Sequence, residues 1–96
     1  MNVVLDARRM ETKESAHAYL QEKLSFPEYY GKNLDALYEC LCEISDMEVV
    51  ILHRCEARDY YWKVETVFRK AGEDNKDLRV QYAGYKKRRG RRRGKR

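Results

Sequence analysis

The sequence has few cysteines and no long apolar run, which argues against a disulfide-rich secreted protein and against a membrane protein. Its three cysteines, Cys40, Cys42 and Cys55, are odd in number and irregularly spaced, which argues against a disulfide framework and favours reduced thiols. The first apolar run, Val-Val-Leu at residues 3–5, is too short for the core of a signal peptide or for a membrane span. We therefore expect a soluble protein of the cytoplasm that binds no membrane.

The sequence also lacks a catalytic constellation. No serine lies in a nucleophile motif, and His17 and His53 have no evident triad partners. Cys40, Cys42, His53 and Cys55 are side chains that zinc accepts, but Cys40 and Cys42 point about 200° apart if they share a helix. We predict a protein that is not an enzyme and that holds no metal and no cofactor.

Charge is distributed unevenly along the 96 residues, which carry 21 Lys and Arg against 16 Asp and Glu. Residues 86–96 contain nine of the basic residues and no acidic residue. Residues 1–85 therefore hold 12 basic and 16 acidic groups, a net charge of −4. We predict one small domain over residues 1–85, followed by a disordered basic tail over residues 86–96.

The periodicity of apolar residues predicts an α/β domain. In chain order we expect a strand over residues 2–7, a helix over 12–24, a helix over 34–44, a strand over 47–53, a helix over 58–72 and a strand over 77–83. The strand over 47–53 is apolar enough to be covered on both faces, and Gly72 is expected to stop the third helix. Helical crossovers between strands imply a small three-stranded parallel sheet packed with helices.

The second predicted helix separates an apolar stripe from an acidic ridge. Asn33 is a good N-cap for it. Its apolar residues recur at steps of three and four on one face: Leu34, Leu37, Leu41 and Ile44. Three carboxylates spaced four residues apart line the other side, close to Cys42; we call Asp35, Glu39 and Glu43 the acidic ridge.

Tyrosines surround the acidic ridge. Tyr29 and Tyr30 lie in the connection over residues 26–32, which we call the tyrosine loop, with Gly31 at its turn, and Tyr38 lies on the flank of the helix. Exposed tyrosines beside a charge cluster are typical of a protein-binding surface. We predict that a partner protein contacts Tyr29, Tyr30, Gly31, Asn33, Leu34, Asp35, Tyr38, Glu39, Cys42 and Glu43.

Simpler interpretations of the same residues stay open. The acidic ridge could be a solvated helix face, and Tyr30 or Tyr29 could pack beneath the loop. Paired carboxylates can also serve as a general acid and base, but a convex helix face without a nucleophile disfavours a hydrolase.

The basic tail is the other strong signal in the sequence. Arginine pairs well with phosphate, and no aromatic residue follows Tyr85, so any binding of RNA or DNA should be independent of base sequence. The residues that would bind nucleic acid are Lys86, Lys87, Arg88, Arg89, Arg91, Arg92, Arg93, Lys95 and Arg96. Alternatively, the tail only solubilises the protein, or it folds back onto the acidic ridge.

Residues 24–41 resemble the barstar family, whose members inhibit secreted ribonucleases such as barnase from inside the cell. The similarity is densest in Pro27-Glu28-Tyr29-Tyr30-Gly31, Asn33-Leu34-Asp35-Ala36-Leu37 and Cys40-Leu41, and a weaker likeness extends it over residues 2–83. The resemblance implies a small parallel sheet flanked by helices. It also implies an inhibitor of the immunity or antitoxin type that is a monomer when free.

In the family, the second helix and the loop before it enter the active site of the ribonuclease. On the matching positions, the resemblance implies that Tyr29, Asn33, Leu34 and Asp35 contact the enzyme. It also implies that the carboxylates of Asp35 and Glu39 meet the basic groups that otherwise hold RNA phosphate. The implied partner is a basic, extracellular-type ribonuclease or a related toxin, similar to barnase.

The sequence departs from the family pattern at three positions. Tyr38 stands where tryptophan is usual, Glu39 where aspartate is usual, and Lys70 where a glutamate is usual. Lysine at position 70 would repel a basic enzyme, and the segment between the second strand and the third helix is shorter than usual. These departures indicate a partner whose surface differs from that of the usual target.

Overall fold

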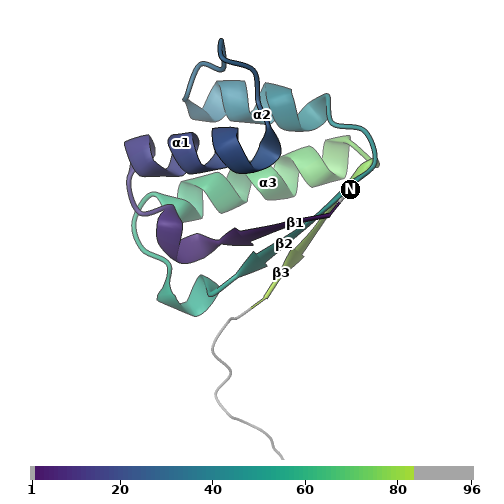
Figure 1. The fold of residues 1–96 in the computed structure, drawn as a ribbon. Helices are drawn as coiled ribbons and strands as arrows, with labels where there is room; N and C mark the ends of the chain where they lie inside the picture. Colours follow the sequence, from purple (N-terminus) through teal and green to yellow (C-terminus); the bar gives the residue numbers. More distant parts are fainter. Residues whose placement is uncertain (1, 84–96) are drawn as a thin grey trace, which may run out of the picture.

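The computed structural model describes residues 2–83, and its elements follow the predicted order (Figure 1). They are β1 (Asn2–Asp6), α1 (Lys13–Leu24), α2 (Leu34–Cys42), β2 (Met47–Leu52), α3 (Tyr61–Asp74) and β3 (Leu78–Tyr82). Two short 3₁₀ helices that were not predicted, η1 (Ala7–Arg9) and η2 (Arg54–Glu56), follow β1 and β2. Within residues 2–83, no helix has the length and apolar character needed to cross a bilayer.

The three strands form one parallel sheet in the order β1-β2-β3. Val3 pairs with Val49, and Val49 pairs with Val80, so β2 is the central strand. The chain leaves β1 through α1 and α2 before it enters β2, and it leaves β2 through α3 before it enters β3. Such crossovers are what parallel neighbours require. The predicted α/β fold with a three-stranded parallel sheet is confirmed.

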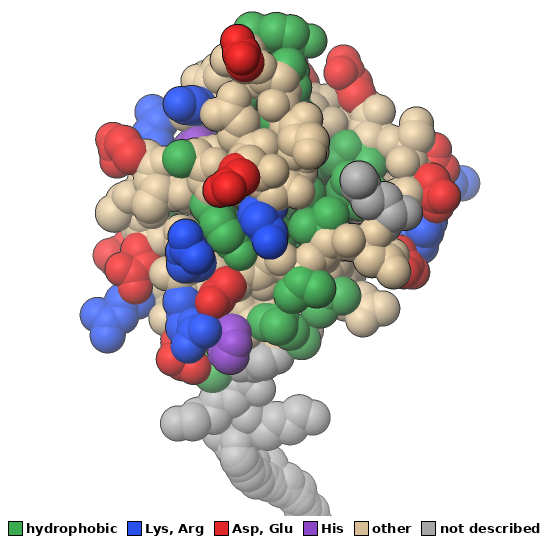
Figure 2. Space-filling model, in the orientation of Figure 1, with side chains coloured by type: hydrophobic (Ala, Val, Ile, Leu, Met, Phe, Trp, Pro, Cys, Tyr) green, Lys and Arg blue, Asp and Glu red, His purple; other side chains and the backbone are tan. Residues whose placement is uncertain are grey.

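All three helices lie on one side of this sheet (Figure 1). Leu5 and Ile51 face the helices and are fully buried, whereas Val4, on the opposite face, is 53% exposed and Val50 is only half-buried. Figure 2 shows hydrophobic side chains at the surface around the strands. The prediction that the strand over residues 47–53 is covered on both faces is therefore wrong, because one layer of helices covers one face only.

The apolar stripe of α2 packs against α3. Leu37 and Leu41 are fully buried, while Leu34 and Ile44 are half-buried against the core. On its side, α3 buries Tyr61, Val64, Glu65, Phe68 and Ala71. Burying one large apolar side chain contributes about 2 kcal/mol. The stripe therefore fixes α2 in one rotational setting, with the acidic ridge turned away from the core.

The helix ends differ from the predicted ones for local reasons. Helix α3 passes through Gly72 and ends at Asp74, because the side chain of Asn75 donates hydrogen bonds of 2.9 Å to the carbonyl oxygens of Leu41 and Ile44. These bonds join the end of α3 to the end of α2 and offset the cost of about 1 kcal/mol for an interior glycine. Helix α3 also starts three residues later than predicted, because Asp59 has a left-handed φ of 47°.

Candidate functional site

The tyrosine loop connects α1 to α2 and projects beyond α2 on the side of the molecule away from the sheet (Figure 1). Tyr29 is 88% exposed, whereas Tyr30 is buried. The ring of Tyr30 packs on Phe26 with a centroid separation of 4.9 Å, and its hydroxyl lies 2.5 Å from Nδ1 of His17. Of the interpretations left open above, packing beneath the loop thus applies to Tyr30, while Tyr29 is presented to solvent.

The turn from the loop into α2 is built by adjacent residues. The left-handed residue is Lys32, with φ of 56°, and not Gly31. Glycine at position 31 is favoured for a steric reason. A Cβ there would lie 3.2 Å from Nδ2 of Asn33 and 3.3 Å from Cβ of Ala36, which is closer than most Cβ contacts. Asn33 caps α2 as predicted, because its Oδ1 accepts the Ala36 amide at 2.8 Å while its Nδ2 donates to the Gly31 carbonyl oxygen at 3.2 Å. Loop and helix start therefore form one unit.

The acidic ridge is exposed and lacks ion pairs with the described residues. The side chains of Asp35, Glu39 and Glu43 are all exposed, and within residues 2–83 none of them forms an ion pair. In contrast, the carboxylate of Glu65 lies 2.7 Å from Arg54. One face of α2 thus carries three carboxylates without an ion-pair partner among residues 2–83, although Lys13 and Lys63 line the same hollow as Asp35.

Tyr38 joins the flank of α2 to the end of α3. Its hydroxyl donates a hydrogen bond to Oδ2 of Asp74, and that bond raises the pKa of the phenol. Nζ of Lys70 lies 3.9 Å from the same carboxylate and 5.8 Å from the centre of the Tyr38 ring. The positive charge that Lys70 brings to this surface is therefore partly compensated by Asp74, a residue that was not among the predicted ones.

The cysteines of α2 lie partly within the domain surface. Leu34 and Cys42, both predicted to contact a partner, are half-buried. Cys40 is half-buried too, and burial raises the pKa of its thiol, which lowers the thiolate fraction. In the described part of the chain, no three His, Cys, Asp or Glu side chains gather in a way that could hold a metal ion.

His17 contacts the tyrosine loop but is not among the predicted residues. It is fully buried in α1, with Nδ1 2.5 Å from the Tyr30 hydroxyl and Nε2 2.8 Å from the Tyr60 hydroxyl. Burial lowers the pKa of its imidazole. The sequence contained a signal for this position, because residue 17 lies three and seven residues before Leu20 and Leu24 and so falls on the buried stripe of α1.

The basic residues of the tail lie outside the described residues, 2–83. Their binding of nucleic acid, their disorder, and their return onto the acidic ridge all stay predictions. The described domain does end next to them, because β3 stops at Tyr82.

Comparison with known proteins bears on this site. A family described as "Barstar (barnase inhibitor)" matches residues 1–83. A Bacillus subtilis (strain 168) protein named "Putative ribonuclease inhibitor YrdF" is 42% identical over 50 residues, which is 52% of this chain and 55% of that protein. The chain thus spans about half the length of this curated relative. The match over residues 1–83 confirms the resemblance seen in the sequence, and the chain belongs to the barstar family.

Proposed function

We propose that this protein inhibits a ribonuclease by placing the tyrosine loop and α2 over the active site of the enzyme. The protein would act by binding, in the manner of an immunity protein or antitoxin, and not as an enzyme. Its partner would be a basic ribonuclease or a related toxin similar to barnase, met in the cytoplasm. The described relative, named as a ribonuclease inhibitor, supports this proposal.

The observation that carries the proposal is the exposed acidic ridge, whose carboxylates form no ion pair with the described residues. A ribonuclease active site holds cationic groups for RNA phosphate, and three carboxylates on a rigid helix face offer those groups an alternative partner. Asp35, Glu39 and Glu43 are exposed without ion pairs to described residues, so binding need not first break internal pairs. Long-range attraction would speed the encounter, and desolvation at contact would strengthen the pairing.

The remaining residues of the surface would set specificity. Tyr29 offers a large ring that is 88% exposed beside the carboxylates. Tyr38 is held by Asp74, and Lys70 lies next to both, so the end of α3 forms a mixed-charge rim to the acidic ridge. A partner would need an acidic or neutral group opposite Lys70. This requirement sets it apart from a uniformly basic enzyme.

The test is inhibition of barnase and of other basic microbial ribonucleases by the wild type and by the double variant Asp35→Ala/Glu39→Ala. We expect the double variant to lose at least about 100-fold in affinity, because truncating charges in a desolvated interface costs several kcal/mol. The matched control is Glu11→Ala/Glu22→Ala, which removes two exposed carboxylates outside α2. Equal inhibition by all three proteins would rule out the acidic ridge as the interface.

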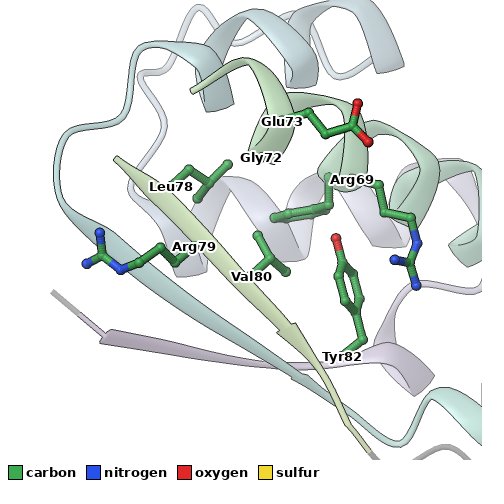
Figure 3. A pocket seen from close by; sticks show the side chains of 8 residues that line it. Arg69, Gly72, Glu73, Leu78, Arg79, Val80 and Tyr82 are labelled. Atoms are coloured by element: carbon green, nitrogen blue, oxygen red, sulfur yellow. The ribbon is translucent and has the colours of Figure 1, made fainter. Parts of the chain in front are cut away.

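A second candidate function, nucleic-acid binding, is favoured by a cluster at the opposite end of the domain. Near the end of β3 the guanidinium of Arg69 lies 4.1 Å from the centre of the Tyr82 ring (Figure 3). The guanidinium of Arg54 lies 5.5 Å from the centre of the same ring. Arg54 also lies 5.8 Å from the ring of Trp62, which is 40% exposed. The guanidinium groups of Arg54 and Arg69 are already paired with Glu65, so the exposed ring of Trp62 is the part of this cluster that could stack a base. The charge that attracts phosphate would come from the basic tail, which follows β3 in the sequence.

Under this second candidate, the protein binds single-stranded RNA with little sequence preference. Affinity for a labelled RNA oligonucleotide should fall steeply with salt and should vanish when residues 86–96 are removed. In the full-length chain, Trp62→Ala should weaken RNA binding without changing the charge, with Val4→Ala as the control for an exposed apolar residue elsewhere. Binding at high salt by the truncated protein would contradict this function.

A further inference from the structure

A buried histidine connects the tyrosine loop to two helices. His17 of α1 contacts the Tyr30 hydroxyl through Nδ1 at 2.5 Å and the Tyr60 hydroxyl through Nε2 at 2.8 Å. Its ring also packs against both tyrosine rings, with centroid separations of 5.7 and 5.5 Å. Tyr60 immediately precedes α3. One imidazole therefore joins α1, the loop and the start of α3.

The loop has few other polar attachments to the body of the domain. The Tyr30 amide donates to the carbonyl oxygen of Pro27 at 3.0 Å within the loop itself. From α1, the Gln21 side chain donates to the same carbonyl oxygen at 2.9 Å. Since Lys32 is held in a left-handed conformation, the loop also stores backbone strain that its anchors must hold. The contact with His17 anchors the buried ring of Tyr30, the residue that follows the exposed Tyr29.

Two hydrogen bonds next to Tyr30 couple the position of this residue to the start of α2. The residue after Tyr30 is Gly31, whose carbonyl oxygen accepts from Nδ2 of Asn33. Asn33 in turn caps α2 through the Ala36 amide. A shift of Tyr30 would therefore displace the N-cap, and with it the carboxylate of Asp35 at the start of the acidic ridge.

The two contacts of His17 require one particular protonation state. A neutral imidazole has one N–H donor and one acceptor nitrogen, so one tyrosine hydroxyl donates to the ring while the other accepts from it. A second proton turns the acceptor nitrogen into a donor, so the tyrosine O–H that pointed at it loses its acceptor and must rotate away. It also places a positive charge on a buried ring, which is costly. The other titratable groups around the cluster are Lys13 and Glu14 of α1 and Cys40 of α2.

We propose that His17 is a positioning residue for partner binding. In its neutral form it holds Tyr30, and through Tyr30 both the exposed Tyr29 and the start of α2, in the geometry that the partner meets. Protonation of the ring releases this arrangement and weakens binding. The link to a partner rests on the proposed function, whereas the positioning of the loop is a property of the free protein and can be measured without one.

Amide hydrogen exchange of the free protein tests the positioning directly. In His17→Phe, which keeps a ring but no hydrogen bonds, protection of the Tyr30 and Ala36 amides should fall about tenfold more than protection of Val49 in β2. Tyr60→Phe, the matched control, removes the contact to α3 and should leave the protection of the loop close to that of the wild type. His17→Gln, which offers a donor and an acceptor, should recover part of the lost protection.

The pH dependence of amide protection distinguishes a protonation-dependent role of His17 from a purely structural one. Because burial holds the pKa of His17 below 6.5, protection of the Tyr30 amide in the wild type should fall as the pH drops from about 6.5 through the folded pKa. In His17→Phe the protection factor should not change over the same range. Loss of protection at Tyr30 only in step with Val49, or an identical acid response in the variant, would overturn the proposal.

Binding of barnase, measured by calorimetry at pH 7.5 and 5.5, forms the second arm. His17→Phe should bind about tenfold more weakly at pH 7.5, and acidification should weaken the wild type more than the variant. Because the enzyme titrates identically in both experiments, the difference isolates His17. If the wild type does not bind barnase, the proposed function fails for that enzyme, and the exchange measurement alone decides whether His17 positions the loop.

Discussion

Replacing Glu65 with glutamine should destabilise the fold more than any change on the acidic ridge. The side chain of Glu65 is 8% exposed, and its carboxylate accepts hydrogen bonds from Arg54 at 2.7 and 2.9 Å, from Tyr61 at 2.6 Å and from Arg69 at 3.0 and 3.2 Å. Burial raises the pKa of this carboxyl, but the hydrogen bonds from Arg54, Tyr61 and Arg69 outweigh burial and leave it below its ordinary value.

The expected magnitude follows from burial. The side chain of Arg54 is only 13% exposed, so Glu65→Gln removes the charge that faces a largely buried cation, at a cost of about 3 kcal/mol. Arg69→Gln removes a partner of the same carboxylate whose side chain is 51% exposed, and should cost roughly 0.5 to 1 kcal/mol. Each variant replaces one charged partner of the same ion-pair cluster with glutamine, so the difference in cost reports mainly how deeply the replaced side chain is buried.

Urea unfolding followed by circular dichroism measures both variants. Glu65→Gln should also lower the thermal midpoint by roughly 12 to 24 °C. Since the folded pKa of Glu65 is lowered, its stabilising effect is present above the unfolded value of 4.5 and is lost as the pH falls through the folded pKa. The gap between wild type and variant should therefore close in acid. A cost no larger than that of Arg69→Gln, or a gap unchanged at pH 3, would refute this reasoning.

Three further predictions concern the turn into α2 and the rim of the acidic ridge. Lys32→Gly should raise the free energy of unfolding by about 0.5 to 1 kcal/mol in urea titrations, because Lys32 has φ of 56°; a loss of stability would show that its side chain matters more. Asn33→Ala should cost about 1 kcal/mol, while Asn33→Asp, which keeps the accepting oxygen, should cost much less. Lys70→Glu should raise the association rate with barnase at low salt in stopped-flow experiments, and the gain should fade at high salt; an unchanged rate would place residue 70 outside the interface.

The fold was largely predictable because periodicity reports which faces are buried. The steps of three and four between Leu34, Leu37 and Leu41 identify the buried face of α2, and the N-caps Thr12 and Asn33 mark where two helices begin. The number of helical layers was not predictable. The run around Val50 places apolar side chains on both faces of the sheet. This pattern is the same whether helices cover one face or both, so the number of covered faces follows only from the arrangement of the three helices.

The exposure of residues on the candidate surface was predictable from the sequence. Tyr29 and Asp35 follow from composition and spacing. The contacts of His17 and Asp74 could not be predicted, because each joins residues distant in the chain: Tyr60 lies 43 residues from His17, and Tyr38 lies 36 residues from Asp74. The strain at Lys32 was hidden for another reason, since glycine was the obvious residue for the turn and stands one position earlier to avoid a clash.

Titration of the ¹⁵N-labelled protein with barnase, followed by amide chemical shifts, tests the central claim most directly. If the tyrosine loop and α2 form the interface, the largest shifts should fall within residues 29–43, with Tyr29 and Asp35 among them. The amides of Val4 and Val50 on the open face of the sheet should stay unchanged. Shifts concentrated on that open face, with the acidic ridge unaffected, would contradict the claim.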